Sequence, residues 1–177
     1  MKHIKKFKKI FPLQVGNLTI RIIEEQDIRW YIDNIKSDYY NEYSDYKYTP
    51  EYEDFIENKI HNIVKLASLG VDSPDELRFT LEVNGKQAGG FSINEINSNT
   101  LKVSYFITPD NQHKSLAYTM LNESIKALRN TKYKYIIANI QCINEHSIKL
   151  IERLGFKEVQ RYQGVKCEVI RYEVRIH

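Results

Sequence analysis

The sequence predicts a single α+β domain built on a mixed sheet, with helices on both faces of that sheet. Two observations lead to this prediction. The chain has 177 residues, of which 42% are apolar, and this is enough for one hydrophobic core but short for two. Apolar residues follow a period of two in some segments and helical spacing in others, in a mixed order without internal repeats.

The first half of the chain is predicted to begin with one strand and two helices. Alternating apolar residues over 18–22 predict a strand, and helical spacing predicts helices over 28–35 and 55–67. Gly70 and Pro74 follow the second apolar stripe and are typical of the end of a helix.

Three strands are expected next. Alternation over 79–83 leads into Asn84-Gly85, which is the strongest short signal for a hairpin, and a second strand runs from residue 86 to about 96. Gly89-Gly90 inside that strand indicates a bulge or a close approach of another group. A third strand is expected over 101–107.

The last third is expected to start with a polar turn after Pro109. The elements that follow are a helix over 116–128, a strand over 135–140, a helix over 144–154, and strands over 158–162 and 166–176. Asn144 is a suitable N-cap for the second of these helices, and Gly155 is a suitable residue to end it.

Net charge does not identify a partner, but apolar segments and cysteine content limit the class of protein. Lys and Arg number 26 against 23 Asp and Glu, so the net charge of +3 neither requires nor excludes an anionic partner. No apolar stretch is long enough for a bilayer and no leader-like start is visible, so we expect a cytosolic protein without membrane contact. The chain has two cysteines, Cys142 and Cys167, far apart and without metal-site spacing. This argues against a disulfide scaffold and a zinc site and favours packing roles for both.

The first twelve residues are predicted to form a basic arm outside a domain that spans 13–177. This arm holds Lys2, Lys5, Lys6, Lys8 and Lys9. It is interpreted as one basic turn of helix or a loose solvated terminus. Contact with nucleic acid or a ribosome surface through the arm is an alternative, and it implies binding that depends steeply on salt.

An acidic, tyrosine-rich segment runs from Asp38 to Asp54. It carries six carboxylates against Lys47 alone, and it holds six of the thirteen tyrosines. The residues are Asp38, Glu42, Asp45, Glu51, Glu53 and Asp54, with Tyr39, Tyr40, Tyr43, Tyr46, Tyr48 and Tyr52. Negative charge beside aromatic faces suits a cationic ligand, while a solvated loop leading into a helix explains the segment about equally well.

Two motifs in the last third resemble one enzyme family. Residues 144–156 read Asn-Glu-His-Ser-Ile-Lys-Leu-Ile-Glu-Arg-Leu-Gly-Phe, and residues 112–117 read Gln-His-Lys-Ser-Leu-Ala. The first resembles the Asn-x-x-Ser helix ending in Leu-Gly-Phe of the GNAT superfamily of acyl-CoA N-acyltransferases, and the second its Gln/Arg-x-x-Gly-x-Gly/Ala turn. The resemblance covers residues 18–176 and is nearest to the branch that acetylates ribosomal-protein N-termini.

The resemblance implies a mostly antiparallel GNAT-like sheet, splayed fourth and fifth strands, and acetyl-CoA as cosubstrate. The coenzyme pyrophosphate would be held at the turn formed by Gln112, His113, Lys114, Ser115, Leu116 and Ala117. A helix N-terminus supplies free N–H donors and a partial positive charge for such a group. Ser115 stands where the family has glycine, so lowered coenzyme affinity is expected.

The resemblance also assigns the groups around the acyl carbon. Free backbone groups near Phe106, Ile107 and Thr108, on the fourth strand, would hold the acetyl carbonyl and the pantetheine arm. Ser147 would hydrogen-bond the departing thiolate, and Asn144 would hold a pantetheine amide or cap the helix. The tyrosine that serves as proton donor elsewhere in the superfamily is replaced by Ile151.

The general base is the least defined part of the predicted site. Positions where relatives carry glutamates hold Lys102 and Thr119, which leaves Tyr105 and His146 as titratable groups near the cleft. At pH 7 about 14% of an α-amine is neutral, against about 0.04% of a lysine side chain. A site without an evident base therefore favours a peptide or protein N-terminus, or another amine of low pKa.

The sequence thus predicts an acetyl-CoA-dependent N-acetyltransferase acting by direct attack in a ternary complex. Because Ser115, Lys102, Thr119 and Ile151 depart from the family pattern, a degenerate, non-catalytic protein that binds a coenzyme or partner is the alternative. No metal is expected, and the protein is expected to be a monomer or a homodimer.

Overall fold

The computed structural model describes residues 4–44, 49–72 and 76–177. In chain order its elements are α1 (Ile4–Ile10), β1 (Leu13–Val15), β2 (Leu18–Ile22), the 3₁₀ turn η1 (Glu25–Asp27), α2 (Ile28–Ile35), α3 (Asp38–Tyr43), α4 (Pro50–Leu69), β3 (Leu77–Val83), β4 (Lys86–Asn97), β5 (Thr100–Ile107), the 3₁₀ turn η2 (Pro109–Asn111), α5 (Leu116–Leu128), β6 (Tyr135–Gln141), α6 (Glu145–Arg153), β7 (Lys157–Gln163) and β8 (Glu168–Arg175).

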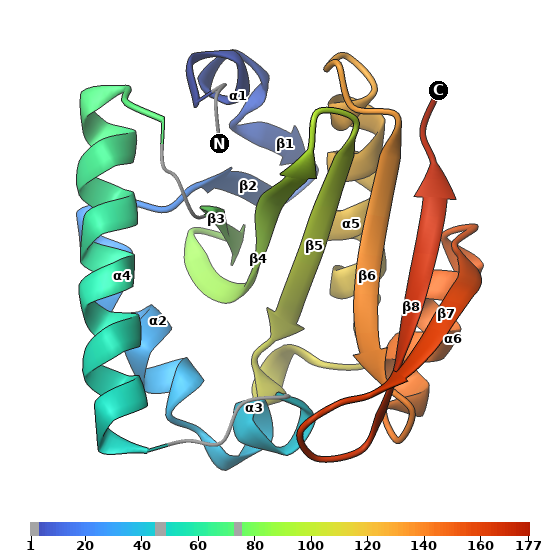
Figure 1. Cartoon of the computed structure of the whole chain (residues 1–177). Helices are drawn as coiled ribbons and strands as arrows, with labels where there is room; N and C mark the ends of the chain where they lie inside the picture. The colour runs from blue at the N-terminus through green and yellow to red at the C-terminus, as the bar shows by residue number, and fades with distance from the viewer. Residues whose placement is uncertain (1–3, 45–48, 73–75) are drawn as a thin grey trace.

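In the described part of the chain, eight strands form one sheet in the order β1-β2-β3-β4-β5-β6-β8-β7. Neighbouring strands are antiparallel except for β5 and β6, which are parallel and are connected through α5 (Figure 1). The predicted mixed, mostly antiparallel sheet is therefore confirmed. Within the described residues, no helix is long and apolar enough to cross a membrane.

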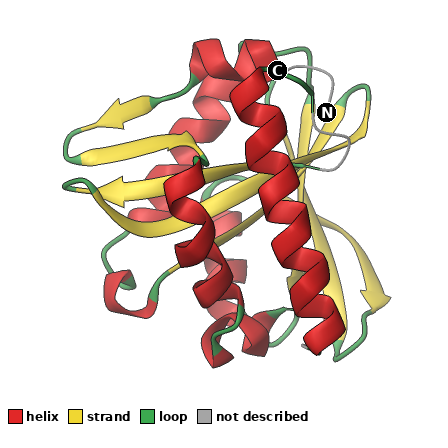
Figure 2. Cartoon of the chain, turned by 90° about the vertical axis from the view of Figure 1, so that its left-hand side faces the viewer, coloured by secondary structure: helices red, strands yellow, loops and turns green. Residues whose placement is uncertain are grey.

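Two hydrophobic clusters occupy the two faces of the sheet. The larger one joins β3, β5 and β6 to α1, α5 and α6, while the smaller one is made by α2 and α4 together with Phe106 of β5. Figure 2, seen from the side of α4, shows this long helix crossing in front of the sheet. The alternation of strand side chains sends Tyr105 toward α6 and Phe106 toward α2, so one strand serves both faces.

Of the two forms predicted for the basic arm, the described part takes the first, a turn of helix, and this helix packs against the sheet. Residues 4–10 form α1, and Phe7 is fully buried in the larger cluster together with Phe11. Lys5, Lys6 and the other described lysines of this helix stay exposed, whereas Lys2 lies outside the described residues. The segment is thus an amphipathic helix packed on the sheet, held by the apolar residues that interleave its lysines.

The hairpin and the bulge that glycines predicted are both present in the sheet. Asn84 and Gly85 have φ values of 51° and 74°, as a two-residue type I′ hairpin requires. At the predicted bulge, Leu81 pairs with Gly89 and Glu82 with Gln87, which leaves Ala88 as the extra residue.

Gly90 allows a close approach between the sheet and α2. A Cβ at Gly90 would overlap the Tyr31 hydroxyl, which donates a 2.6 Å hydrogen bond to the Phe79 carbonyl.

The acidic, tyrosine-rich segment forms a short helix and the start of a long one. Ser37 caps α3, which was not predicted as a separate element, and Thr49 caps α4, which begins at Pro50 rather than near residue 55. Asp45, Tyr46, Lys47 and Tyr48 lie outside the described residues, as does Pro74. Gly70 ends α4 in the left-handed conformation, as predicted.

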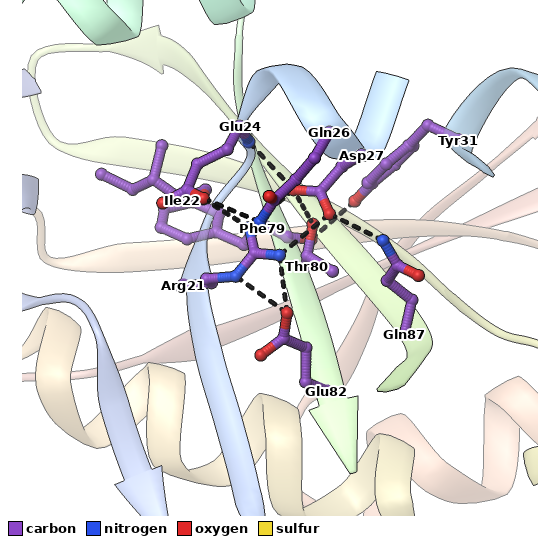
Figure 3. Close-up of polar contacts among 10 residues, drawn as sticks. All are labelled: Arg21, Ile22, Glu24, Gln26, Asp27, Tyr31, Phe79, Thr80, Glu82 and Gln87. Carbon is purple, nitrogen blue, oxygen red and sulfur yellow. Dashed lines mark hydrogen bonds and ion pairs between the residues drawn. The ribbon is translucent and has the colours of Figure 1, made fainter. Parts of the chain in front are cut away.

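A buried carboxylate fixes the start of α2 on the sheet (Figure 3). Asp27 is fully buried and accepts hydrogen bonds of 2.6 and 2.9 Å from Arg21 of β2, and others from Thr80 and Gln87. Burial alone would raise the pKa of Asp27, but the hydrogen bonds from Arg21, Gln87 and the Glu24 backbone hold it below its usual value. The network thus joins three strands to the helix that carries Tyr31.

Replacing Asp27 tests this network. Asp27→Asn leaves the nearly buried Arg21 guanidinium without its main partner, and we expect the free energy of unfolding in urea at pH 7 to fall by about 3 kcal/mol. Asp33→Asn, which removes an exposed i,i+4 partner of Arg29, is the matched control and is expected to change stability by about 0.5 kcal/mol or less.

The same variant predicts a pH dependence. Because the pKa of Asp27 is lowered on folding, its stabilisation is present above the unfolded pKa of about 3.9 and is lost as pH falls through the folded pKa. The stability difference between wild type and Asp27→Asn should therefore shrink on acidification below about pH 4. A difference that stays constant to pH 2 would contradict this account.

Candidate active site between two diverging strands

The parallel strands β5 and β6 pair over a short stretch and then separate. Their register runs from Thr100 opposite Tyr135 to Val103 opposite Ala138, yet β5 continues to Ile107 and β6 to Gln141. Figure 1 shows the two strands diverging toward the end at which α3 lies. The gap predicted between the fourth and fifth strands therefore exists, between β5 and β6 in the observed numbering.

The backbone groups that face this gap differ from those expected. The Thr108 N–H donates to the Ala88 carbonyl at 3.0 Å, and the Phe106 carbonyl lies against Gly89, so both residues turn their backbone groups toward β4. In an antiparallel pair these directions alternate, which turns the groups of Tyr105 and Ile107 toward β6. The expectation is thus corrected for Phe106 and Thr108, and it is retained for Ile107.

The turn before α5 presents a row of free backbone donors. Among the described residues, no acceptor is found for the backbone N–H groups of residues 113–118, and the first bond of the helix joins Thr119 N–H to the Ser115 carbonyl at 3.0 Å. His113 and Ser115 both have a φ of 58°, a left-handed conformation that favours glycine. Donors at a helix N-terminus of this kind form an anion site.

The side chains of this turn offer fewer donors to the anion site than the sequence predicted. Lys114 folds back and donates to the Asp110 carbonyl at 2.7 Å, while the Gln112 Nε2 atom is buried and finds no acceptor among the described residues. The His113 ring packs edge-on against His146 with 6.0 Å between ring centroids. That contact brings the N-termini of α5 and α6 together, with Leu116 and Ala117 half-buried in the first turn of α5.

The predicted Ser147 lies in the first turn of α6 beside the gap. The Asn144 side chain accepts the Ser147 N–H at 3.1 Å, so Asn144 is the N-cap that fixes this serine. The Tyr105 hydroxyl is buried next to Ser147, without a hydrogen bond of standard length and angle. Burial raises the pKa of Tyr105 to about 12 against a smaller opposing effect of Ser147, so its hydroxyl is protonated at pH 7.

The face of the sheet opposite α5 and α6 is lined with aromatic rings at the gap. Phe106 contacts Trp30, Tyr31 and Tyr40, with centroid distances of 5.7, 5.5 and 5.9 Å. Tyr40 comes from the acidic, tyrosine-rich segment, whose carboxylates Asp38, Glu42, Glu51 and Asp54 are exposed. Part of that segment therefore lies beside the gap, on the side away from the free donors.

Sequence reasoning missed Gln141, the last residue of β6. Its side chain is 3% exposed, and neither its Oε1 nor its Nε2 has a hydrogen-bond partner among the described residues. Because Ile140 belongs to the cluster with α5, alternation places Gln141 on the face of Phe106. The only signal in the sequence was a polar residue ending an otherwise apolar strand.

Three of the four departures from the family pattern take structural positions in the sheet and its helices. Ile151 is fully buried in the larger cluster, Thr119 donates its hydroxyl to the Ser115 carbonyl at 3.2 Å, and Lys102 lies half-buried on β5. His146 is exposed at the start of α6. Across the described ranges, no group of three or more His, Cys, Asp or Glu side chains is placed to hold a metal ion.

Comparison with protein families gives one match over most of the chain. The family described as Acetyltransferase (GNAT) domain matches residues 17–157. No curated protein sequence matches the chain.

Solved structures share the fold at low sequence identity. A ribosomal protein L7/L12 α-N-protein acetyltransferase in complex with coenzyme A has a TM-score of 0.77 at 13% identity, covering 93% of this chain and 97% of that chain. A ribosomal-protein-S5-alanine acetyltransferase from Vibrio fischeri has 0.74 at 15%, covering 92% and 95%. Spermidine N-acetyltransferase from Vibrio cholerae, with coenzyme A and spermine, has 0.70 at 22%, covering 91% and 96%.

Proposed function

The chain belongs to the GNAT acetyltransferase family and is an acetyl-CoA-dependent N-acetyltransferase, and from this premise we propose that its acceptor is the α-amine of a peptide or protein N-terminus. The observation that carries the proposal is that free backbone donors, two hydroxyl groups and an aromatic face meet at one gap. The candidates for the general base, Tyr105 and His146, do not include a carboxylate.

Acetyl-CoA is proposed to lie across the gap with its diphosphate on the N–H groups of residues 113–118. The site fits this group because the donors are free and the helix dipole favours negative charge. The pantetheine arm then follows β5, where the backbone groups of Tyr105 and Ile107 face the opening. Asn144 acts as the cap that fixes Ser147, and its amide N–H₂ group remains as a donor for a pantetheine carbonyl.

Transfer is proposed to proceed by direct attack of the neutral amine on the thioester carbonyl. The new C–N bond forms, the C–S bond breaks, and the thiolate is stabilised or protonated by the Ser147 hydroxyl, with Tyr105 as a second donor beside it. The amine releases its proton to solvent. Because no protein base is assigned, the fraction of acceptor that is already neutral limits the reaction. An α-amine, about 14% neutral at pH 7, therefore suits the site better than a lysine side chain.

The acceptor is proposed to approach from the side of Phe106, Trp30 and Tyr40. Aromatic faces attract a primary ammonium group before it loses its proton. The exposed carboxylates of the segment from Asp38 to Asp54 attract the same cation by their negative charge. Gln141 offers an unpaired donor and acceptor on that face of the sheet, which match the two polar groups of a peptide bond.

A panel of acceptors tests the proposal by release of free coenzyme A thiol. We expect turnover with peptides that have a free N-terminus and little turnover with the same peptides after N-terminal blocking, even when they contain lysine. Activity confined to spermidine, other polyamines or lysine side chains would show that the acceptor is of another class.

Because α1 exposes its lysines, adding salt while measuring a ribosomal-protein acceptor tests whether that helix attracts an anionic partner.

Ser147→Ala is expected to lower kcat by roughly 10²-fold while leaving the Kd of acetyl-CoA little changed, because the hydroxyl acts mainly on the departing thiolate. Ser104→Ala removes an exposed hydroxyl from β5 and is the matched control, with wild-type kinetics expected. If Ser147→Ala turns over as fast as wild type, the thiolate is protonated by water and the proposed role of Ser147 is wrong.

Ser115→Gly is expected to tighten acetyl-CoA binding severalfold, because glycine adopts the left-handed conformation at this position without strain and lets the phosphates approach the backbone. Asn84→Gly makes the same kind of change in the β3–β4 hairpin, where φ is 51°, and it should leave the affinity unchanged. Calorimetry with both variants separates a local effect on the coenzyme turn from a general gain in stability. Equal or weaker binding by Ser115→Gly would contradict the proposed position of the diphosphate.

A further inference from the structure

The two cysteines of the chain, far apart in sequence, meet at one backbone carbonyl. Cys142 follows β6 and Cys167 precedes β8. The Cys142 N–H donates to the Glu168 carbonyl at 2.9 Å, and the Cys167 Sγ lies 3.5 Å from the same oxygen. The antiparallel pairing of Gln141 with Val169 explains the meeting, since it places the residues just beyond each strand end side by side.

The thiols interact with each other as well as with that carbonyl. The Cys167 thiol has the Cys142 thiol and the backbone of Cys142 and Ile143 as neighbours. Burial, with the neighbouring thiol adding to it, raises the pKa of Cys167. Both cysteines are free of disulfides and only partly buried.

We propose that Cys142 and Cys167 form a reversible intramolecular disulfide when the protein meets a hydroperoxide. In the first step the Cys142 thiol gives up its proton and the thiolate attacks one peroxide oxygen, so that an S–O bond forms and the O–O bond breaks. The departing hydroxide or alkoxide takes up that proton and leaves as water or an alcohol, and Cys142 becomes a sulfenic acid. In the second step the Cys167 thiol attacks that sulfur, the S–S bond forms and the sulfenic hydroxyl leaves as water. Two thiols are oxidised, one hydroperoxide is reduced, and a dithiol reductant reverses the reaction.

The position of the pair gives this bond a consequence for the site. Cys142 lies two residues before Asn144, the cap that fixes Ser147. Cys167 follows Lys166, whose ammonium group donates to the Asn41 carbonyl of α3, so the tip of the β7–β8 hairpin reaches the helix beside the gap. The disulfide therefore ties the turn that carries the catalytic serine to the hairpin tip that contacts α3. This consequence rests on the proposed function, whereas formation of the bond does not.

Peptide mapping tests the bond without any measurement of activity. The full chain is treated with hydrogen peroxide, remaining thiols are alkylated, and trypsin places the two cysteines on peptides 135–149 and 167–171. We expect these peptides to be cross-linked within one chain, with a mass lower by two hydrogen atoms, and to separate after dithiothreitol. Thiols that stay free, oxidise separately to sulfinic acids, or cross-link only between chains would overturn the proposal.

Single variants supply the controls. Cys142→Ser and Cys167→Ser each keep one thiol, so neither forms the intramolecular bond, and both should show sulfenic acid or mixed disulfides instead. Peroxide should change acceptor turnover in the wild type and leave the double variant unaffected. An equal response in both proteins would overturn the proposed effect on the site. A wild type that transfers no acetyl group would count against the proposed function, and the mapping would still decide the bond.

Discussion

The structure depends on the early separation of two parallel strands. After four paired positions β5 and β6 part, and the backbone groups of Tyr105 and Ile107 lose the neighbour that a continuous sheet would provide. Unpaired backbone groups carry a cost when they are removed from water, so these groups must pair with water or with a bound molecule. In the proposed function, an extended thioester arm takes this place along β5.

The rest of the fold holds the gap open and furnishes its two sides. On one side, the caps at Ser115 and Asn144 place the starts of α5 and α6 within contact distance through His113 and His146. On the other, the buried Asp27 network anchors α2, and the Tyr31 hydroxyl rests over Gly90 so that the aromatic rings reach Phe106. The two sides therefore differ in chemistry, polar where a phosphate would bind and aromatic where an amine would approach.

Much of this arrangement was predictable from the sequence, because it depends on local chemistry. Asn84-Gly85 specifies its hairpin by backbone conformation alone, and the residues from Asn144 to Phe156 fix a cap, an apolar stripe and a helix end within one short segment. The burial of Phe7 was not predictable, since interleaved lysines read as a solvated terminus until a sheet is present to receive the apolar side.

The orientation of groups at the gap required the three-dimensional register. Which of Phe106, Ile107 and Thr108 faces the opening depends on the pairing with β4, and the bulge at Ala88 sets that pairing. Gln141 was missed because its lack of a partner depends on which strands end beside it. The meeting of Cys142 and Cys167 likewise depends on the β6–β8 ladder, which joins segments that are distant along the chain.

The order of strands has a consequence for how the molecule acquires its shape during synthesis. Hairpins such as β3–β4 and β7–β8 form from neighbouring residues, whereas β6 must find β5 across the whole of α5 and is covered on its other edge only by β8. Until β8 pairs with it, β6 is an edge strand whose free backbone groups can pair with another chain. Pairing with β8 covers that edge and holds in place the strand that forms one side of the opening.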